Sequence, residues 1–186
     1  MSSPDAAAPM SKSPFWRFSV KFYAEAGVAQ ACIDLQDQAG VDVNLLFFLL
    51  WNATQGRALS EAEVAELERT IGAWRDMAVV PLRNVRRALK SPPPAVAPDA
   101  AEGFRTRIKA VELEAERLQQ EAMYGLAQSG RLGRPAASAT EAAGASVAAY
   151  QAVLRQFPKQ PLDLVLAAFA AFAASGHGNA AGARTA

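Results

Sequence analysis

The sequence predicts an all-α protein, folded as a single-domain bundle of about seven to eight helices with no sheet. Three observations support this prediction: apolar residues recur at helical spacing, capping signals precede most of these segments, and no segment alternates as a strand does. The chain has 186 residues, of which 51% are hydrophobic, so it can bury the core of one domain. We expect that domain to span residues 13–174, between disordered segments at 1–12 and 175–186.

Two helices are predicted at the start of the domain. Ser13 can act as an N-cap and Pro14 suits a first helical turn, so a helix begins there and runs to about Glu25. A second helix begins at Gly27 and ends at Gly40, because glycine readily takes the left-handed conformation that follows many helices.

A third helix, at about residues 42–54, contains the most apolar run of the chain. Every residue of Leu45–Trp51 is apolar, so this run must be buried. Leucine dominates it and no second strand is available to pair with it, which favours a helix over a buried strand.

The middle of the chain predicts two helices and a linker. Ser60 and Glu63 form a capping box at the start of a helix. Pro81 must kink or break this helix near Val80. A shorter helix then covers residues 82–90. The Pro-rich segment 91–98 is a stiff surface linker.

A long helix is predicted from Asp99 to about Gln128. Its apolar residues recur every three or four positions and predict the side that faces the core. This predicted core stripe consists of Phe104, Ile108, Val111, Ala115, Leu118 and Ala122.

The last third of the domain predicts a loop and two helices. The loop covers residues 129–137, and Ser138 then caps a helix rich in small residues that runs to about Phe157. Pro161 begins the last helix, 162–174, which is apolar nearly all round. Such a helix is buried in its own bundle or in a partner, so a homo-oligomer through 162–174 is an alternative to simple packing.

Residue counts exclude several kinds of chemistry. The chain has one cysteine, Cys32, and one histidine, His177, which lies in a Gly/Ala-rich tail. The core therefore lacks the histidine of a Ser-His-Asp or Cys-His system and the ligands of a zinc cluster. One cysteine and no signal peptide suit a cytoplasmic protein, and no run approaches the ~20 apolar residues of a membrane span.

Four carboxylates allow a metal-site hypothesis. Asp34 and Asp37 share one helix face, and Glu112 and Glu116 lie one turn apart on the long helix. Together they could hold a divalent cation. The simpler interpretation, which we favour, is that the aspartates are solvated and the glutamates form ion pairs with Arg83, Arg86 or Arg105.

A basic helix face is formed by Arg83, Arg86, Arg87 and Lys90. It could dock an acidic partner, but the net charge of +1 does not predict nucleic-acid binding. A solvated or salt-bridged face is the simpler interpretation. If Arg83 points inward, toward Glu112 or Asp42, it would belong to a buried polar network.

Aromatic residues allow a second binding hypothesis. Trp16, Tyr23 and Trp51 could line a pocket for an apolar ligand such as a lipid tail or quinone, with Asp42 and Asn44 at its mouth. The simpler interpretation is that the aromatics belong to the core and that Asp42 or Asn44 caps the third helix.

Several residues of the first two thirds of the chain share a distinctive order and spacing. They are Phe15-Trp16, Tyr23, Gly27-Val28, Leu35-Gln36, Asp42–Leu46, Trp51, Trp74, Pro81-Leu82-Arg83, Arg86 and Glu112–Glu116. This pattern resembles an uncharacterised bacterial family that is known as a domain of unknown function. The resemblance covers roughly residues 14–128, and it implies no known activity, ligand or partner.

The leading functional hypothesis is a non-catalytic helical interaction or regulatory module that binds another protein. The alternative is a binder of a small apolar ligand, and a less favoured one is a carboxylate enzyme that uses a divalent metal. No cofactor is expected. The residues predicted to bind are Trp16, Tyr23, Asp42, Asn44, Trp51, Arg83, Arg86, Arg87, Glu112 and Glu116. The metal hypothesis uses Asp34, Asp37, Glu112 and Glu116.

Overall fold

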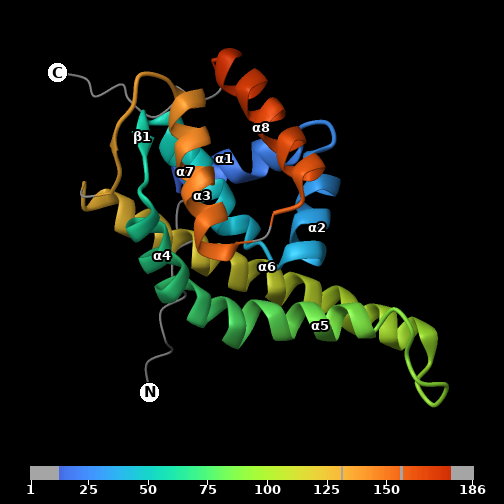
Figure 1. Cartoon of the computed structure of the whole chain (residues 1–186). Helices are drawn as coiled ribbons and strands as arrows, with labels where there is room; N and C mark the ends of the chain where they lie inside the picture. Colours follow the sequence, from blue (N-terminus) through green and yellow to red (C-terminus); the bar gives the residue numbers. More distant parts are fainter. Residues whose placement is uncertain (1–12, 131, 156, 177–186) are drawn as a thin grey trace, which may run out of the picture.

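The computed structural model describes residues 13–130, 132–155 and 157–176, and these residues are almost entirely helical (Figure 1). The predicted all-α class is confirmed. The helices are α1 (Pro14–Tyr23), α2 (Val28–Ala39), α3 (Val43–Thr54), α4 (Glu61–Trp74), α5 (Val80–Ala88), α6 (Pro98–Gln128), α7 (Ala139–Leu154) and α8 (Lys159–Ala174). The predictions made for residues 1–12 and 177–186 lie outside the described residues.

Helix α3 is the centre of the molecule. All nine residues of Leu45–Ala53 are buried, which confirms the predicted burial of this run. Helices α1, α6 and α7 pack around α3. Because the helix is covered on every side, it needs no polar face.

A cluster of phenylalanines joins α1, α3 and α8. The ring of Phe22 on α1 lies 5.2 Å from Phe47, 6.1 Å from Phe169 and 5.6 Å from Phe172, centroid to centroid. These edge-on contacts are favourable for aromatic rings. They bring the last helix against the first, so α8 is part of the chain's own core.

The prediction of no sheet was wrong at one place. Two-residue strands β1 (Arg57–Ala58) and β2 (Arg134–Pro135) pair antiparallel, in the loops before α4 and before α7. The guanidinium of Arg57 also donates to the carbonyl of Leu132 at 3.0 Å. A pair this short has no alternating pattern in the sequence, so it depends on the contacts between the two loops.

Gly133 allows these two loops to approach each other. Its φ is +70°, and a Cβ placed there would lie 3.0 Å from the carbonyl oxygen of Ala58. Gly130 has a similar φ of +69° but open space around it. We expect Gly133→Ala to lower the free energy of unfolding by about 2 kcal/mol and Gly130→Ala by about 1 kcal/mol, measured by urea denaturation. Equal losses would show that the close contact with Ala58 is unimportant.

Helix α4 continues into α5 without a break. The predicted interruption at Pro81 is replaced by a π-helical segment, η1 (Arg75–Val79), in which the amide of Val80 donates to the carbonyl of Arg75. Pro81 falls in the first turn of α5. A proline lacks an N–H, and the widened turn before it accommodates this change in the hydrogen-bond pattern.

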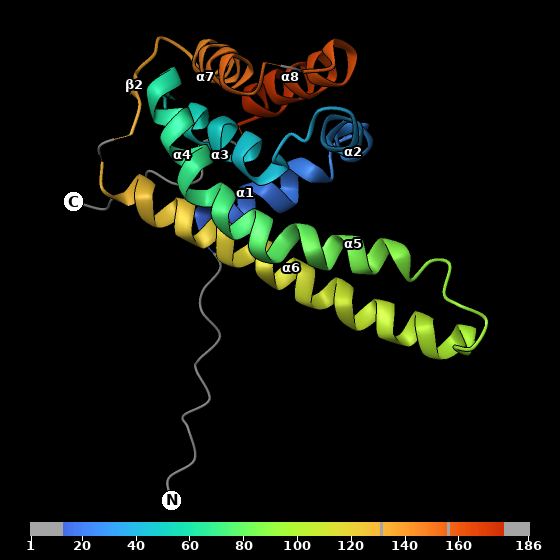
Figure 2. The same cartoon turned by 60° about the horizontal axis from the view of Figure 1, so that its bottom comes forward.

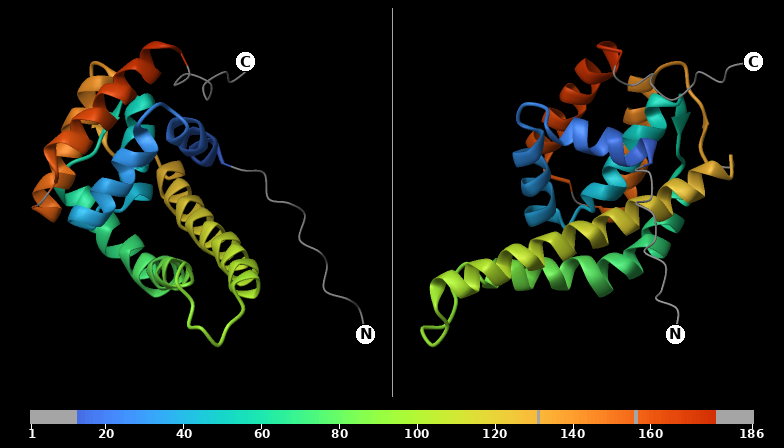
Figure 3. Two further views of the ribbon diagram at one scale, coloured as in Figure 1. Left: turned by 90° about the vertical axis from the view of Figure 1, so that its right-hand side faces the viewer. Right: turned by 180° about the vertical axis from the view of Figure 1, so that it is seen from behind.

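Helices α5 and α6 form a long antiparallel hairpin that lies across one side of the body made by α1, α2, α3, α7 and α8 (Figure 2). The connection between them, residues 89–97, is the tip of the hairpin. This tip projects beyond the body, as both views of Figure 3 show.

The predicted core stripe of α6 was wrong for most of its residues, because only Ala115 of the six is buried. Phe104, Val111 and Leu118 are 43%, 52% and 43% exposed. The other buried residues of α6 are Ala101, Glu112, Gln119, Gln120 and Met123. Helix α6 therefore turns Glu112, Gln119 and Gln120 inward, among small and apolar residues, and leaves much of its apolar face in solvent.

The last two helices differ from prediction at their facing ends. Helix α7 ends at Leu154 because Arg155 takes a left-handed conformation, with φ of +62°. Helix α8 begins at Lys159, two residues before Pro161. Leu162, Val165, Phe169 and Phe172 face the body of the same chain, whereas Leu164 is 40% exposed. None of the helices in the described part of the chain is long and apolar enough to cross a bilayer.

Candidate functional site

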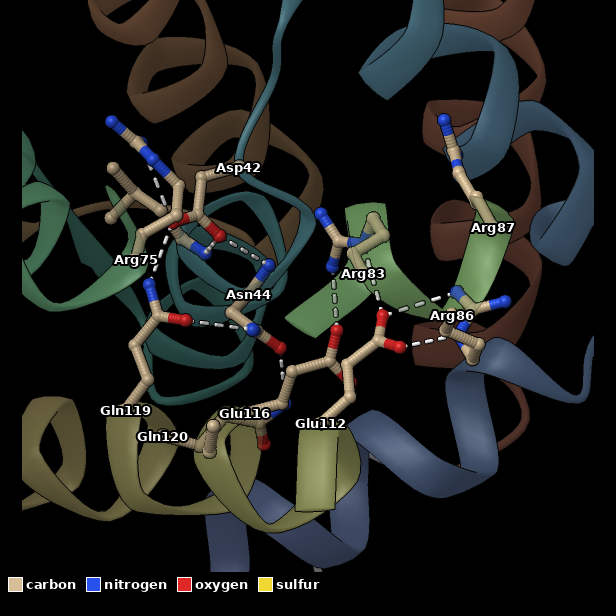
Figure 4. Close-up of polar contacts among 12 residues, drawn as sticks. Asp42, Asn44, Arg75, Arg83, Arg86, Arg87, Glu112, Glu116, Gln119 and Gln120 are labelled. Atoms are coloured by element: carbon tan, nitrogen blue, oxygen red, sulfur yellow. Dashed lines mark hydrogen bonds and ion pairs between the residues drawn. The ribbon is translucent and has the colours of Figure 1, made fainter. Parts of the chain in front are cut away.

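A layer of polar side chains separates α6 from α3 and from the α4–α5 helix (Figure 4). It contains most of the charged and amide residues that the sequence predicts to bind. Because buried polar groups are costly unless paired, the partners of each side chain show what the layer does.

Asp42 is the N-cap of α3 and is only 5% exposed. Its Oδ1 accepts from the backbone amides of Asn44 at 2.9 Å and Leu45 at 3.2 Å. Its Oδ2 accepts from Nε2 of Gln119 at 2.6 Å. Both carboxylate oxygens are therefore occupied, and the predicted capping role of Asp42 is confirmed.

Asn44 joins α3 to α6 through two amide side chains. Its Nδ2 donates to Oε1 of Gln119 at 2.9 Å, and its Oδ1 accepts from Nε2 of Gln120 at 2.7 Å. Gln119 thus contacts both Asp42 and Asn44. These bonds require one rotation and one register of α6 against α3.

Arg75, in the π-helical segment, lies at one end of the layer. Its Nη1 is 2.6 Å from Glu68 and 3.5 Å from Asp42. Burial opposes the charged form, but hydrogen bonds to Asp76 and Glu68 and the nearby Asp42 charge raise the pKa of Arg75 overall. The sequence suggested Arg83 as a partner of Asp42 or Glu112. In the structure the arginine beside Asp42 is Arg75.

Glu112 and Glu116 are paired with arginines of α5, as the simpler interpretation predicted. Nε of Arg83 lies 3.1 Å from Oε1 of Glu112, and Nη2 of Arg83 lies 2.7 Å from Glu116. Arg86 bonds both oxygens of Glu112. The third predicted arginine, Arg105, pairs with Glu102 instead.

Burial, hydrogen bonds and neighbouring charges shift the pKa of two members of this cluster, Glu116 and Arg86. Burial raises the pKa of Glu116, and the Arg83 charge opposes this effect. The hydrogen bonds from Arg86 to Glu112 raise the pKa of Arg86. Glu112 is only 5% exposed and faces two guanidiniums. This cluster therefore joins α5 to α6 in the part of the hairpin that packs against the body.

The carboxylates of the metal hypothesis do not assemble. Asp34 accepts from Gln30 at 2.8 Å on its own helix, and Asp37 pairs with Arg87 at 2.8 Å. Glu112 and Glu116 are occupied by arginines. No group of three or more His, Cys, Asp or Glu side chains suited to a metal occurs within residues 13–130, 132–155 and 157–176.

The three aromatic residues of the pocket hypothesis differ in exposure. Trp16 and Trp51 are 8% and 7% exposed, whereas Tyr23 is 42% exposed. Burial, followed by the charges of Cys32 and Glu116, raises the pKa of Tyr23.

An open groove of about 380 Å³ lies beside Trp51, with Tyr124, Gln55 and Arg57 among its lining. Neither Asp42 nor Asn44 lines this groove, so they do not form its mouth. They lie at the other end of α3, bound to Gln119. The groove is open to solvent and its lining includes polar side chains such as Gln55 and Arg57, which suits an enclosed apolar ligand poorly.

Sequence reasoning missed five members of the layer: Glu68, Arg75, Gln119, Gln120 and Tyr150. The sequence contains a pattern that could have indicated the two glutamines. Glu112, Glu116, Gln119 and Gln120 recur at helical spacing and mark a polar stripe beside the apolar one. No sequence signal distinguishes Tyr150, which is one aromatic residue in an alanine-rich helix.

Tyr150, on α7, anchors the layer to the body. Its side chain is fully buried, and its hydroxyl accepts from the backbone amide of Asp42 at 3.0 Å. Burial and the charges of Asp42 and Glu68 raise the pKa of Tyr150 well above its ordinary value, so the hydroxyl stays protonated.

Removal of the Tyr150 hydroxyl should be costly. We expect Tyr150→Phe to lower the free energy of unfolding by about 2 kcal/mol, because it leaves the buried amide of Asp42 unpaired. Chemical denaturation measures the loss, and hydrogen exchange at Asp42 locates it. Tyr124→Phe is the control, because the Tyr124 hydroxyl has no hydrogen-bond partner among the described residues. Equal losses in the two variants would exclude this role.

These elements define the protein class as an all-α domain whose helical hairpin is held to its body by a buried polar layer. The family model described as "Protein of unknown function (DUF2390)" matches residues 14–123, and the chain belongs to this family. The match runs from α1 through most of α6, so it includes the polar layer except Tyr150. No curated protein and no solved structure matches the chain significantly.

Proposed function

We propose that the protein is a non-catalytic helical interaction module, and that it binds another protein chain through the exposed apolar face of the α5–α6 hairpin. One observation carries this proposal. Phe104, Val111 and Leu118 have the spacing of a buried helix face, yet each is more than 40% exposed. Contiguous exposed apolar side chains are typical of interaction surfaces.

Helix α5 and the turn before it add further apolar surface to the hairpin. Val85 is 43% exposed and Met77 is 69% exposed. The ion pairs of Arg83 with Glu116 and of Arg86 with Glu112 place Val85 at about the level of Val111. The two helices therefore offer apolar side chains at the same height along the hairpin.

The basic face contributes less to this proposal than the sequence predicted. Arg83 and Arg86 bind Glu112, and Arg87 binds Asp37 on α2. Three of the four basic residues are thus used within the chain. The apolar face of the hairpin replaces them as the proposed surface for a partner.

Two further proposals follow from the sequence. One is a cytoplasmic location. The other is a homo-oligomer through residues 162–174, and the burial of Leu162, Val165, Phe169 and Phe172 in the chain's own core leaves less apolar surface for it.

Site-specific photo-crosslinking in the native host tests the proposal. A photo-reactive amino acid in place of Val111 should crosslink to a protein chain. The same group in place of Leu113 is the control, because Leu113 is equally exposed, at 52%, but lies roughly 200° away around α6. Absence of any protein crosslink at position 111, or equal crosslinking at 113, would overturn the proposal.

A further inference from the structure

We infer that the partner of this hairpin face is a second copy of the same chain, paired antiparallel along α6 about a two-fold axis at Val111. The inference rests on the proposed function, because it names the occupant of the same surface. Both the spacing of the apolar residues and the placement of the neighbouring charges support it.

The apolar residues are symmetric about Val111. Phe104 lies seven residues before it and Leu118 seven residues after it, and all three share one exposed side of α6. In a two-fold pair, a residue that contacts another is contacted in return by its copy. An antiparallel pair centred on Val111 therefore places Phe104 against the partner's Leu118, and Val111 against the partner's Val111.

The charges beside this stripe are complementary in the same register. Arg107 follows Phe104 by three residues, and Glu114 follows Val111 by three residues, so both lie on one flank of the stripe. In the antiparallel pair, Arg107 meets the partner's Glu114, and this contact occurs twice. A parallel two-fold pair would instead turn this flank toward the partner's opposite flank, so Arg107 and Glu114 would not meet across the seam.

This flank of α6 is open to a partner. Arg107 is exposed at the surface over the ring of Phe104, with its Cζ 5.6 Å from the ring centroid. The side chain of Glu114 is 55% exposed and bonds Arg117 on its own helix. The opposite flank differs, because Glu112 there is buried against Arg83 and Arg86. Helix α6 therefore has one buried flank and one flank exposed at the surface.

The shape of the molecule leaves room for a second hairpin. The α5–α6 hairpin lies along one side of the body, and its tip projects beyond it (Figures 2 and 3). Two hairpins paired through α6 would bring four helices together, with Val85 of each α5 at the edge of the seam. This arrangement buries apolar side chains from both helices of each hairpin, as four-helix bundles do.

Cysteine crosslinking tests the register. The only native cysteine, Cys32, is buried, and burial raises its pKa to about 12, so it does not interfere. Val111→Cys should form a disulfide-linked dimer, because this residue meets its own copy. Phe104→Cys alone should not, since two copies lie about 20 Å apart, which is too far for a disulfide. A mixture of Phe104→Cys and Leu118→Cys chains should crosslink.

A charge exchange tests the same interface without new covalent bonds. Arg107→Glu and Glu114→Arg should each raise the dimer dissociation constant about tenfold, measured by sedimentation equilibrium. The double variant Arg107→Glu/Glu114→Arg should regain most of the affinity, because the charge pairs are restored with exchanged signs. Circular dichroism should show each variant folded, since both side chains lie at the surface.

The outcomes separate this inference from the proposed function. A wild-type chain that stays monomeric at high concentration, or Phe104→Cys that crosslinks to itself, overturns the antiparallel dimer. If position 111 then crosslinks in the host to a different protein, the proposed function stands and the second copy is excluded. If it crosslinks to no protein, both fail. If the double charge variant dimerises no more tightly than the single variants, the proposed register is wrong.

Discussion

Phe22→Ala is expected to lower the free energy of unfolding by about 3–5 kcal/mol, because it leaves a cavity where four aromatic rings meet. Phe22 is fully buried and contacts Phe47 on α3 and both Phe169 and Phe172 on α8. The loss should therefore affect the attachment of the last helix as well as the core. Urea denaturation followed by circular dichroism measures it.

Val20→Ala is the control for this experiment. Val20 lies on the same helix and is 55% exposed, so its truncation should change stability by less than about 0.5 kcal/mol. Hydrogen exchange should show faster opening of α8 in Phe22→Ala than in Val20→Ala. A Phe22→Ala protein that is destabilised as little as Val20→Ala would show that the cluster does not hold α1 and α8 together.

Glu112→Ala is expected to lower the free energy of unfolding by about 3 kcal/mol, because it removes one partner of a buried ion pair and leaves guanidiniums without compensation. Arg86 loses the carboxylate that it binds, and Arg83 retains only Glu116. The two cations then lie close together in a region that excludes most water. Thermal and chemical denaturation of the purified variant measure the loss.

Glu102→Ala is the matched control, because it removes the same side chain from the same helix. Glu102 forms an exposed ion pair with Arg105, three residues away, which contributes about 0.3–0.5 kcal/mol. At high salt the small effect of Glu102→Ala should shrink further, whereas the loss in Glu112→Ala should persist. Comparable losses at low salt would show that the buried cluster contributes no more than a surface pair.

Local signals were sufficient to locate the helices. Ser13, Ser60 and Ser138 each cap the helix that the sequence predicted from them. Gly40 ends α2 in the left-handed conformation, with φ of +65°. These features depend on a few neighbouring residues, so a single sequence reveals them.

The errors in the fold lie where distant segments meet. The β1–β2 pair depends on two loops that are far apart in sequence, and the left-handed Arg155 that ends α7 is a non-glycine residue with no local signal. The π-helical turn before Pro81 accompanies packing of the α4–α5 helix on α6, where Trp74 donates to the carbonyl of Ala115 at 2.9 Å. Periodicity within one segment contains no information about such contacts.

The site was predicted in part. The pairing of Glu112 and Glu116 with Arg83 and Arg86 was the simpler of two interpretations, and the structure contains these ion pairs. The connection of this cluster to Asp42 and Asn44 through Gln119 and Gln120 was not foreseen. Amide side chains are usually exposed, so nothing in their identity predicts that these two are buried.

The sequence alone determined the approximate position of each helix and that α3 is enclosed, because capping, glycine conformation and a fully apolar run are local properties. Only the tertiary structure decided which face of α6 is buried. Polarity predicted that Phe104, Val111 and Leu118 would face the core, but their side of the helix is exposed. The polar face is buried because other helices supply its partners, and paired polar groups can be enclosed where unpaired ones cannot.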